Sequence, residues 1–290
     1  MPQIFEDLAL IKAQVADVNS RLDRFSSKEA QILLFQIYKD LTTHQLPHIL
    51  PDFTEVGFRC YSQFEEDGIL LYLFSVIGTT NKIAVEISAG DGFVCNTTNL
   101  IVNHGWWGFL IDGNETNVER GNEFFSSLKD TWLYPPKFIC AWITAENVNN
   151  VLRSMGVEGP IDLLSLDIDG MDYWVWKAID CIQPRIVVCE TQNIIGPEDA
   201  LTVPYDPDFI ATTQDYQGAS LAAMTKLAKT KGYRLIGTHR FGFNAFYIKE
   251  EIAGELFPTV SVEGCLQDPY TLASRAKRWP KVRDLKWERV

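Results

Sequence analysis

The sequence predicts a doubly wound, Rossmann-like α/β domain with a seven-stranded sheet whose last strand is antiparallel, preceded by a helical extension. Three observations predict this fold. From Glu65 onward, short apolar strand patterns alternate with helical patterns, the order that builds βαβ units and a largely parallel sheet. The 290 residues are 46% hydrophobic, enough for one large core but not for a second full domain. Acidic and glycine-containing turns follow several strands, where an open α/β sheet binds its ligands.

The expected strands are short runs of apolar and β-branched residues bounded by turn residues. Helical stretches begin near Cys95, Asn114, Thr144, Asp172 and Ser220. Only residues 239–244 join the last two strands, so these strands should pair antiparallel as a hairpin at the sheet edge. No usable periodicity follows Glu250. The expected strands are residues 83–87, 108–112, 137–142, 161–167, 185–190, 233–238 and 245–249.

Residues 1–57 are predicted to form a helical oligomerisation segment ahead of a ligand-binding domain at 58–290. A helical pattern at 28–46 is closed by Pro47 and Pro51. Before it, apolar residues recur at alternating spacings of four and three, which is the seam of a coiled coil and predicts a homo-oligomer. The alternative is an amphipathic helix lying on its own domain. The seam residues are Ile4, Leu8, Ile11, Val15, Val18, Leu22 and Phe25.

The net charge of −12 argues against nucleic acid as a partner, since a phosphate backbone would be repelled. The only dense basic stretch, residues 275–286, is interpreted as a solvated face. No segment offers the ~20 continuous apolar residues of a membrane span, and the N-terminus lacks the pattern of a secretory leader. We therefore expect a cytoplasmic protein with no membrane partner.

The first candidate site is the turn after the first strand, which reads V-E-I-S-A-G-D-G over residues 85–92. Gly90 and Gly92 allow the backbone to approach a ligand closely. Asp112 ends the next strand, 20 residues after Gly92, at the distance expected for a carboxylate that binds ribose hydroxyls. A simple tight turn is the alternative for the two glycines.

A dinucleotide could also occupy such a turn, but the pyrophosphate fingerprint GxGxxG is incomplete. Cys95 stands where its third glycine would be. Glu86, beside the turn, suits the ammonium of an amino-acid ligand better than a diphosphate. S-adenosylmethionine is therefore the predicted cofactor, and a nicotinamide-dependent dehydrogenase is disfavoured.

From about residue 58 to 250 the chain resembles the FkbM-like group of class I methyltransferases. The resemblance rests on Y-S-Q-F-E-E-D at 61–67, the turn at 85–92, D-L-L-S-L-D-I-D-G at 162–170 and G-F-N-A-F at 242–246. It implies the seven-stranded sheet with an antiparallel last strand. It also implies a cofactor pocket lined by Gln63, Glu86, Gly90, Asn96, Asp112 and Trp142. Gly92 and Asp167, at two strand ends, complete the expected cofactor-binding set.

A second acidic cluster contains Asp167, Asp169 and Asp172, and the next strand ends in Glu190 with Asn193 three residues later. Neighbouring strands should bring Asp167, Asp169, Glu190 and Asn193 together as oxygen ligands for magnesium or another hard divalent cation. The pattern is similar to that of metal-dependent catechol-type O-methyltransferases, whose two ligands after the fifth strand are adjacent instead of three residues apart. Alternatively, the aspartates cap the next helix and hold substrate hydroxyls.

The predicted reaction is O-methylation of a sugar, nucleotide sugar or glycosylated natural product. His239 is the first candidate base and Asp169 the second, because an alcohol must lose its proton to attack a methyl group. The turn-rich stretch 197–218 is a candidate substrate cover. The alternatives are a polyketide or other small-molecule hydroxyl, and a non-catalytic fold that serves as an assembly partner.

Overall fold

The computed structural model describes residues 28–43 and 50–290. The coiled-coil pattern of residues 4–25 lies outside the described residues. Within the part of the chain that is described, no helix has the length and apolar character needed to cross a membrane.

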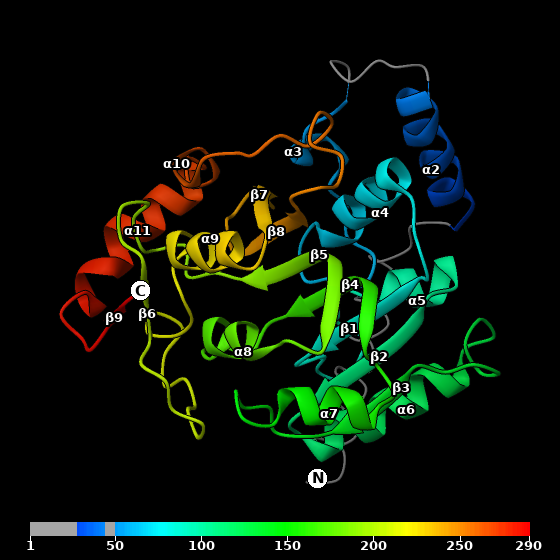
Figure 1. Ribbon diagram of the computed structural model, residues 1–290, viewed down its shortest axis with the longest axis horizontal. Helices are drawn as coiled ribbons and strands as arrows, with labels where there is room; N and C mark the ends of the chain where they lie inside the picture. The colour runs from blue at the N-terminus through cyan, green and yellow to red at the C-terminus, as the bar shows by residue number, and fades with distance from the viewer. Residues whose placement is uncertain (1–27, 44–49) are drawn as a thin grey trace, which may run out of the picture.

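The seven-stranded sheet predicted from the sequence is present, with the order β3-β2-β1-β4-β5-β8-β7 (Figure 1). Strands β1 to β5 run parallel, and β8 lies antiparallel between β5 and β7. The predicted hairpin therefore forms the sheet edge. The strands are β1 (Ile83–Ile87), β2 (Trp107–Asp112), β3 (Lys137–Cys140), β4 (Gly159–Leu166), β5 (Ile182–Glu190), β7 (Tyr233–Thr238) and β8 (Asn244–Lys249).

The strand order reverses at β1, which pairs with β2 on one side and β4 on the other. The loops after these strands therefore turn away in opposite directions and leave a crevice at their carboxyl ends. In open α/β sheets, this crevice is where ligands bind.

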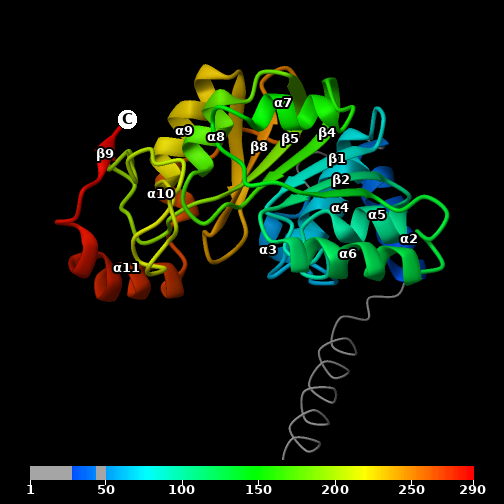
Figure 2. The same cartoon turned by 90° about the horizontal axis from the view of Figure 1, so that it is seen from below.

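Helices cover both faces of the sheet because the buried side chains of each strand alternate between two cores. In β1, Val85 and Ile87 belong to one core, whereas Ala84 belongs to the other. Figure 2 shows the two helical layers. The first consists of α7 (Val148–Ser154), α8 (Asp172–Ala178) and α9 (Leu221–Thr230), and the second of α2 (Lys28–Thr43), α4 (Glu66–Ile77), α5 (Thr98–His104) and α6 (Glu115–Ser127).

The described part of the N-terminal segment packs onto the second layer. Tyr38 of α2 meets Tyr72 of α4 edge to face, with ring centroids 5.0 Å apart. Gln31, which is fully buried, donates to the side-chain oxygen of Asn99 on α5. The short helix α3 (Phe53–Val56) follows and begins at the capping box of Asp52.

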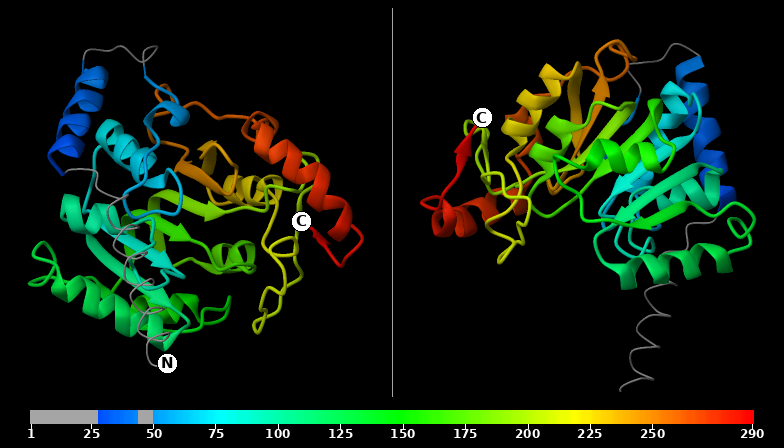
Figure 3. Two further views of the ribbon diagram at one scale, coloured as in Figure 1. Left: turned by 180° about the vertical axis from the view of Figure 1, so that it is seen from behind. Right: turned by 60° about the horizontal axis from the view of Figure 1, so that its bottom comes forward.

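The last 40 residues, for which the sequence offered no periodicity, form α10 (Val262–Cys265), α11 (Pro269–Val282) and β9 (Glu288–Arg289). Helix α11 begins with Asp268 as its cap and Pro269 in its first turn. Strand β9 pairs with β6 (Leu201–Thr202), which follows β5 and precedes α9 along the chain. The tail therefore runs beside the 191–219 segment, as Figure 3 shows.

A buried ion pair ties the amino ends of β1, β4 and β5 together. The side chain of Asp162 is fully buried and accepts hydrogen bonds from the backbone N–H groups of Thr80, Asn81 and Lys82 at 2.7–3.0 Å. Arg185 donates to the same carboxylate at 3.0 Å. One carboxylate thus fixes the loop that leads into β1.

We expect Asp162→Ala to lower the free energy of unfolding by about 3–5 kcal/mol, because it leaves a guanidinium and several N–H groups without their acceptor. Urea unfolding followed by circular dichroism measures the loss. Arg153→Ala is the matched control, since it removes a half-exposed pair with Glu158, and it should cost less than about 1 kcal/mol. Equal losses in the two variants would contradict the assignment.

Candidate functional site

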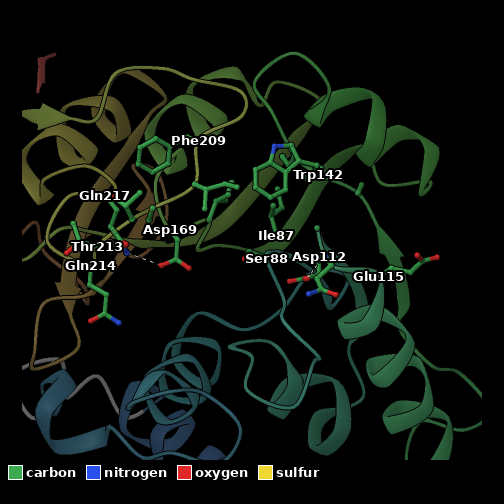
Figure 4. A pocket seen from close by; sticks show the side chains of 18 residues that line it. Ile87, Ser88, Asp112, Glu115, Trp142, Asp169, Phe209, Thr213, Gln214 and Gln217 are labelled. Atoms are coloured by element: carbon green, nitrogen blue, oxygen red, sulfur yellow. Dashed lines mark hydrogen bonds between the residues drawn. The ribbon is translucent and has the colours of Figure 1, made fainter. Parts of the chain in front are cut away.

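A cavity of about 860 Å³ opens at the carboxyl ends of the first four strands. Its walls come from the turns after β1, β2, β3 and β4, and its cover is the 209–217 segment. This is the crevice where the strand order reverses. Figure 4 shows Asp112, Ser88 and Trp142 on one side of it and Asp169, Gln217 and Phe209 on the other. The lining residues are Ile87, Ser88, Asp112–Glu115, Ala141–Ile143, Ile168, Asp169, Phe209–Gln214 and Gln217.

Asp112, the expected ribose-binding carboxylate, lines this cavity. One carboxylate oxygen accepts from the backbone N–H of Gly90 at 2.8 Å. The other accepts from the N–H of Asn114 at 2.9 Å and the amide of Asn117 at 3.1 Å. These bonds fix the carboxylate, and each oxygen can accept from a further donor. Asp112 is therefore a fixed acceptor for ligand hydroxyls.

Two cavity residues without glycine's freedom adopt the left-handed conformation. Ser88 has φ 68° and Asp169 has φ 54°. The turn at Ser88 is tied to β2, since its N–H and that of Ala89 both donate to the carbonyl of Ile111. Non-glycine residues with positive φ carry strain that concentrates at functional sites. No pattern in the sequence pointed to Ser88.

Glu86 faces the loop before α5 and does not line the cavity. Its carboxylate accepts from the backbone N–H groups of Asn96 at 2.9 Å and Thr97 at 2.8 Å, and from the thiol of Cys95. Glu86 is 3% exposed, so these internal donors surround it. The structure thus places this expected cofactor residue as an anchor of the loop.

Of the other residues expected around the cofactor, one lines the cavity and the rest contact the protein around it. Trp142 lines the cavity, is half-exposed and donates from its indole N–H to the carbonyl of Pro207 at 2.7 Å. Gly90 donates its backbone N–H to Asp112. Gly92 faces the core, since a Cβ there would lie 2.6 Å from the ring of Phe125. Asn96 is buried and donates to Ser165. Only the first of these four lines the cavity.

A second cavity, of about 640 Å³, adjoins the first and shares Asp169, Gln214 and Gln217 with it. Gln63, predicted for the cofactor pocket, and Asp167 line this second cavity. Its surface mixes aromatic rings with hydrogen-bonding groups. The lining residues are Gln63, Phe64, Asp167, Asp169, Glu190–Gln192, Gln214, Gln217, Phe241, Phe243, Asn244, Tyr270 and Arg278.

Three of the four predicted metal ligands meet in this second cavity. One side-chain oxygen each of Asp167, Asp169 and Glu190 lies within 4.8 Å of the others. Burial, reinforced by the neighbouring carboxylates, raises the pKa of both Asp167 and Glu190 well above the usual range. Gln217 donates to Asp169 at 2.9 Å. Oxygen ligands gathered in this way could hold a hard cation.

Asp172, the remaining aspartate of this sequence cluster, has a structural role. It is fully buried and accepts from the backbone N–H groups of Ile168 at 2.8 Å and Gly170 at 3.2 Å. Asp172 is the first residue of α8, and it fixes the loop before the helix without capping the helix itself. No side chain caps α8 among the described residues, so the capping role considered for Asp167 and Asp169 is not found, and both face the second cavity.

Asn193, the fourth predicted ligand, does not line either cavity. It is fully buried, and its amide N–H donates to the carbonyl of Phe241 at 2.8 Å. Three residues after Glu190, the chain packs against the 239–243 loop. The side chains of Glu190 and Asn193 therefore do not meet at one point, although they are close in sequence.

His239 lines neither cavity and packs behind aromatic rings that line the second one. Its side chain is fully buried, stacks on Phe64 and accepts from the backbone N–H of Phe241 through Nδ1. Burial lowers its pKa, although the Glu66 carboxylate, 3.7 Å from Nε2, opposes the shift. The structure therefore does not bring this first candidate base to the acidic cluster, whereas Asp169, the second candidate, lies where the cavities meet.

The 197–218 segment, predicted as a substrate cover, supplies cavity residues that the sequence did not single out. Phe209, Gln214 and Gln217 belong to it. Its turn-rich composition was the available signal, but composition does not tell which side chains of a loop point inward.

No protein-family model and no curated protein matches the chain. Among solved structures, an S-adenosylmethionine-dependent methyltransferase from Clostridium acetobutylicum is 13% identical over 73% of this chain and 95% of its own, with a TM-score of 0.40. Magnesium protoporphyrin IX methyltransferase from Synechocystis, with bound SAM, is 12% identical over 78% of this chain and 98% of its own, with a TM-score of 0.42. The N-terminal domain of EvdMO1, solved with SAH and D-fucose, is 12% identical over 72% and 94%, with a TM-score of 0.41. At such identities the activity of this chain must be argued from its own residues.

Proposed function

We propose that the chain is an S-adenosylmethionine-dependent methyltransferase that methylates a hydroxyl oxygen of a sugar-like acceptor. One observation carries this proposal: two cavities with different linings meet at Asp169. A group-transfer enzyme needs a donor and an acceptor held side by side, with the reacting atoms aligned.

The first cavity has the residues to hold the cofactor. Asp112 offers fixed acceptors for two ribose hydroxyls, and Trp142, Ile143 and Ile168 offer apolar surface for an adenine ring. Bound there, S-adenosylmethionine supplies an electrophilic methyl group on a sulfonium. The cavity of about 860 Å³ is within the usual size range of cofactor sites.

A dinucleotide fits these residues less well. Dinucleotide folds place the pyrophosphate at the backbone N–H groups that open the first helix. In this chain Glu86 already accepts from the N–H groups of Asn96 and Thr97 at that point, and a second anion would be repelled. Gly92 packs against Phe125 and leaves no approach for a phosphate.

Asp169 is the residue that we assign as proton acceptor. As the hydroxyl oxygen bonds to the methyl carbon, the carbon–sulfur bond breaks and the hydroxyl proton must leave. Asp169 lines both cavities, and Gln217 holds one of its oxygens. A divalent cation at the neighbouring carboxylates is part of the proposal, and it would supply positive charge that lowers the pKa of the hydroxyl.

The lining of the second cavity favours a polyhydroxylated acceptor that carries an anionic group. Phe64 and Phe243 offer ring faces, and the carboxylates and amides offer hydrogen bonds to hydroxyls. A basic hollow of about 490 Å³ adjoins it, sharing Tyr270 and Arg278 and adding Lys277 and Lys281. Asp215 also lines this hollow and pairs with Arg278 and Lys281, so three cations face one carboxylate there. A nucleotide sugar, or another sugar that carries phosphate, therefore suits the site best, because its phosphate would meet these cations.

Titration calorimetry with S-adenosylmethionine and S-adenosylhomocysteine tests the cofactor. We expect micromolar affinity, weakened about tenfold or more in Asp112→Ala because hydrogen bonds to the ribose are lost. Glu119→Ala, an exposed carboxylate on α6, is the matched control and should bind like the wild type. Absence of binding by a folded wild-type chain would refute the proposal, and micromolar binding of NADH would point to a dehydrogenase.

Replacing the proposed base should separate chemistry from binding. Asp169→Asn is expected to lower kcat by roughly 100-fold or more, the typical contribution of a general base, while S-adenosylhomocysteine affinity changes less than threefold. Single-turnover methyl transfer from labelled cofactor measures the rate. A variant with full kcat would remove Asp169 from the reaction.

The acceptor class can be tested at the basic hollow. Replacing both Lys277 and Lys281 with Ala should raise KM for a nucleotide-sugar or sugar-phosphate acceptor by about tenfold or more, through loss of charge-assisted contacts, with cofactor affinity unchanged. Lys229→Ala, an exposed lysine of α9, is the control. An unchanged KM would favour a neutral acceptor such as a glycosylated natural product.

A further inference from the structure

Strand β8 brings a residue from far along the chain to the carboxylate cluster. In the antiparallel pairing of β5 with β8, Asn244 stands directly opposite Glu190. Residues paired in this way have Cβ atoms about 4.5–5.5 Å apart and project on the same face. Both residues line the second cavity, beside Asp167 and Asp169. Asn244 is therefore a neighbour of the cluster although 54 positions separate it from Glu190.

A hydrogen bond to Glu66 fixes the orientation of the Asn244 amide. Its nitrogen donates to Glu66 Oε1 at 2.8 Å, and the other oxygen of Glu66 accepts from the backbone N–H of Phe64 at 3.0 Å. Because Oε1 of Glu66 accepts from the amide nitrogen, the amide oxygen of Asn244 faces away from Glu66.

Among residues 28–43 and 50–290, nothing pairs with that amide oxygen. Asn244 is 4% exposed, and its Oδ1 is buried without a hydrogen bond. Oε2 of Glu190, across the strand pair, is in the same condition. A buried acceptor left unpaired costs about 1–3 kcal/mol, so two of them on paired residues that line one cavity indicate a missing partner, which a cation would supply.

We propose that Asp167, Glu190 and Asn244 hold a divalent cation, with Asp169 completing the site at its rim. All four offer oxygen, which favours magnesium or manganese over zinc. A site with four protein oxygens leaves coordination positions for water or an acceptor hydroxyl. Asn244 takes the place that the sequence assigned to Asn193. Asn193 also has a free amide oxygen, but it lines neither cavity.

The test uses manganese alone, added to the full chain after treatment with a chelator. Calorimetry should show one Mn²⁺ per chain, with at least about tenfold weaker binding in Asn244→Ala and in Glu190→Gln, since each loses a ligand. Asn193→Ala is the matched control and should bind Mn²⁺ within twofold of the wild type. Circular dichroism verifies that each variant is folded.

A second measurement needs no variant. Anomalous diffraction from wild-type crystals soaked in Mn²⁺ should place the ion about 2.1 Å from the amide oxygen of Asn244. The proposal fails if the ion is absent, if it contacts Asn193 instead, or if Asn244→Ala binds like the wild type. The role of the ion in catalysis rests on the proposed function, but its binding does not. Mn²⁺ binding without cofactor binding would therefore refute the proposed methyltransferase function and leave the cation site standing.

Discussion

The interaction on which the structure depends is the hydrogen bond from backbone N–H groups to buried carboxylates. Asp162 holds the loop before β1, Glu86 the loop before α5, and Asp112 the turn after β1. Asp67 accepts from three consecutive N–H groups at residues 60–62, and Asp172 fixes the loop after β4. Such bonds offset part of the hydration that a buried carboxylate loses, and they hold the loop in one conformation. A chain of net charge −12 thus uses part of its negative charge to shape the loops around its ligand crevice.

The same interaction separates structural carboxylates from the functional candidates. Glu86 and Asp172 have their donors inside the protein, and neither lines the first or the second cavity. Asp167 and Glu190 lack backbone donors of that kind and face the second cavity. Asp112 accepts internal N–H bonds and also lines the first cavity, because those bonds leave its oxygens open to further donors. Acidic residues at strand ends therefore look alike in the sequence and differ in what donates to them.

The two cavities also depend on elements that are distant in sequence. Residues 209–217 close the first cavity, and Arg278 of α11 fixes that cover through its ion pair with Asp215. Tyr216 donates to the carbonyl of Lys286, and β9 pairs with β6. The C-terminal tail is thus part of the architecture of the site. The basic stretch 275–286, interpreted as a solvated face, contributes to a cavity wall through Arg278.

The sequence by itself determined the sheet, because burial on both faces produces apolar runs and connection length decides whether neighbouring strands can be parallel. The same local rules located Asp112 and the Asp167–Asp169 turn at strand ends. Only the tertiary structure decided which polar groups stay unpaired. It turned Glu86 and Asn193 toward backbone partners, buried His239 against Phe64, and brought Asn244 opposite Glu190. Such choices follow from the register of distant strands and the path of long loops, and neither is recorded in the spacing of residues along the chain.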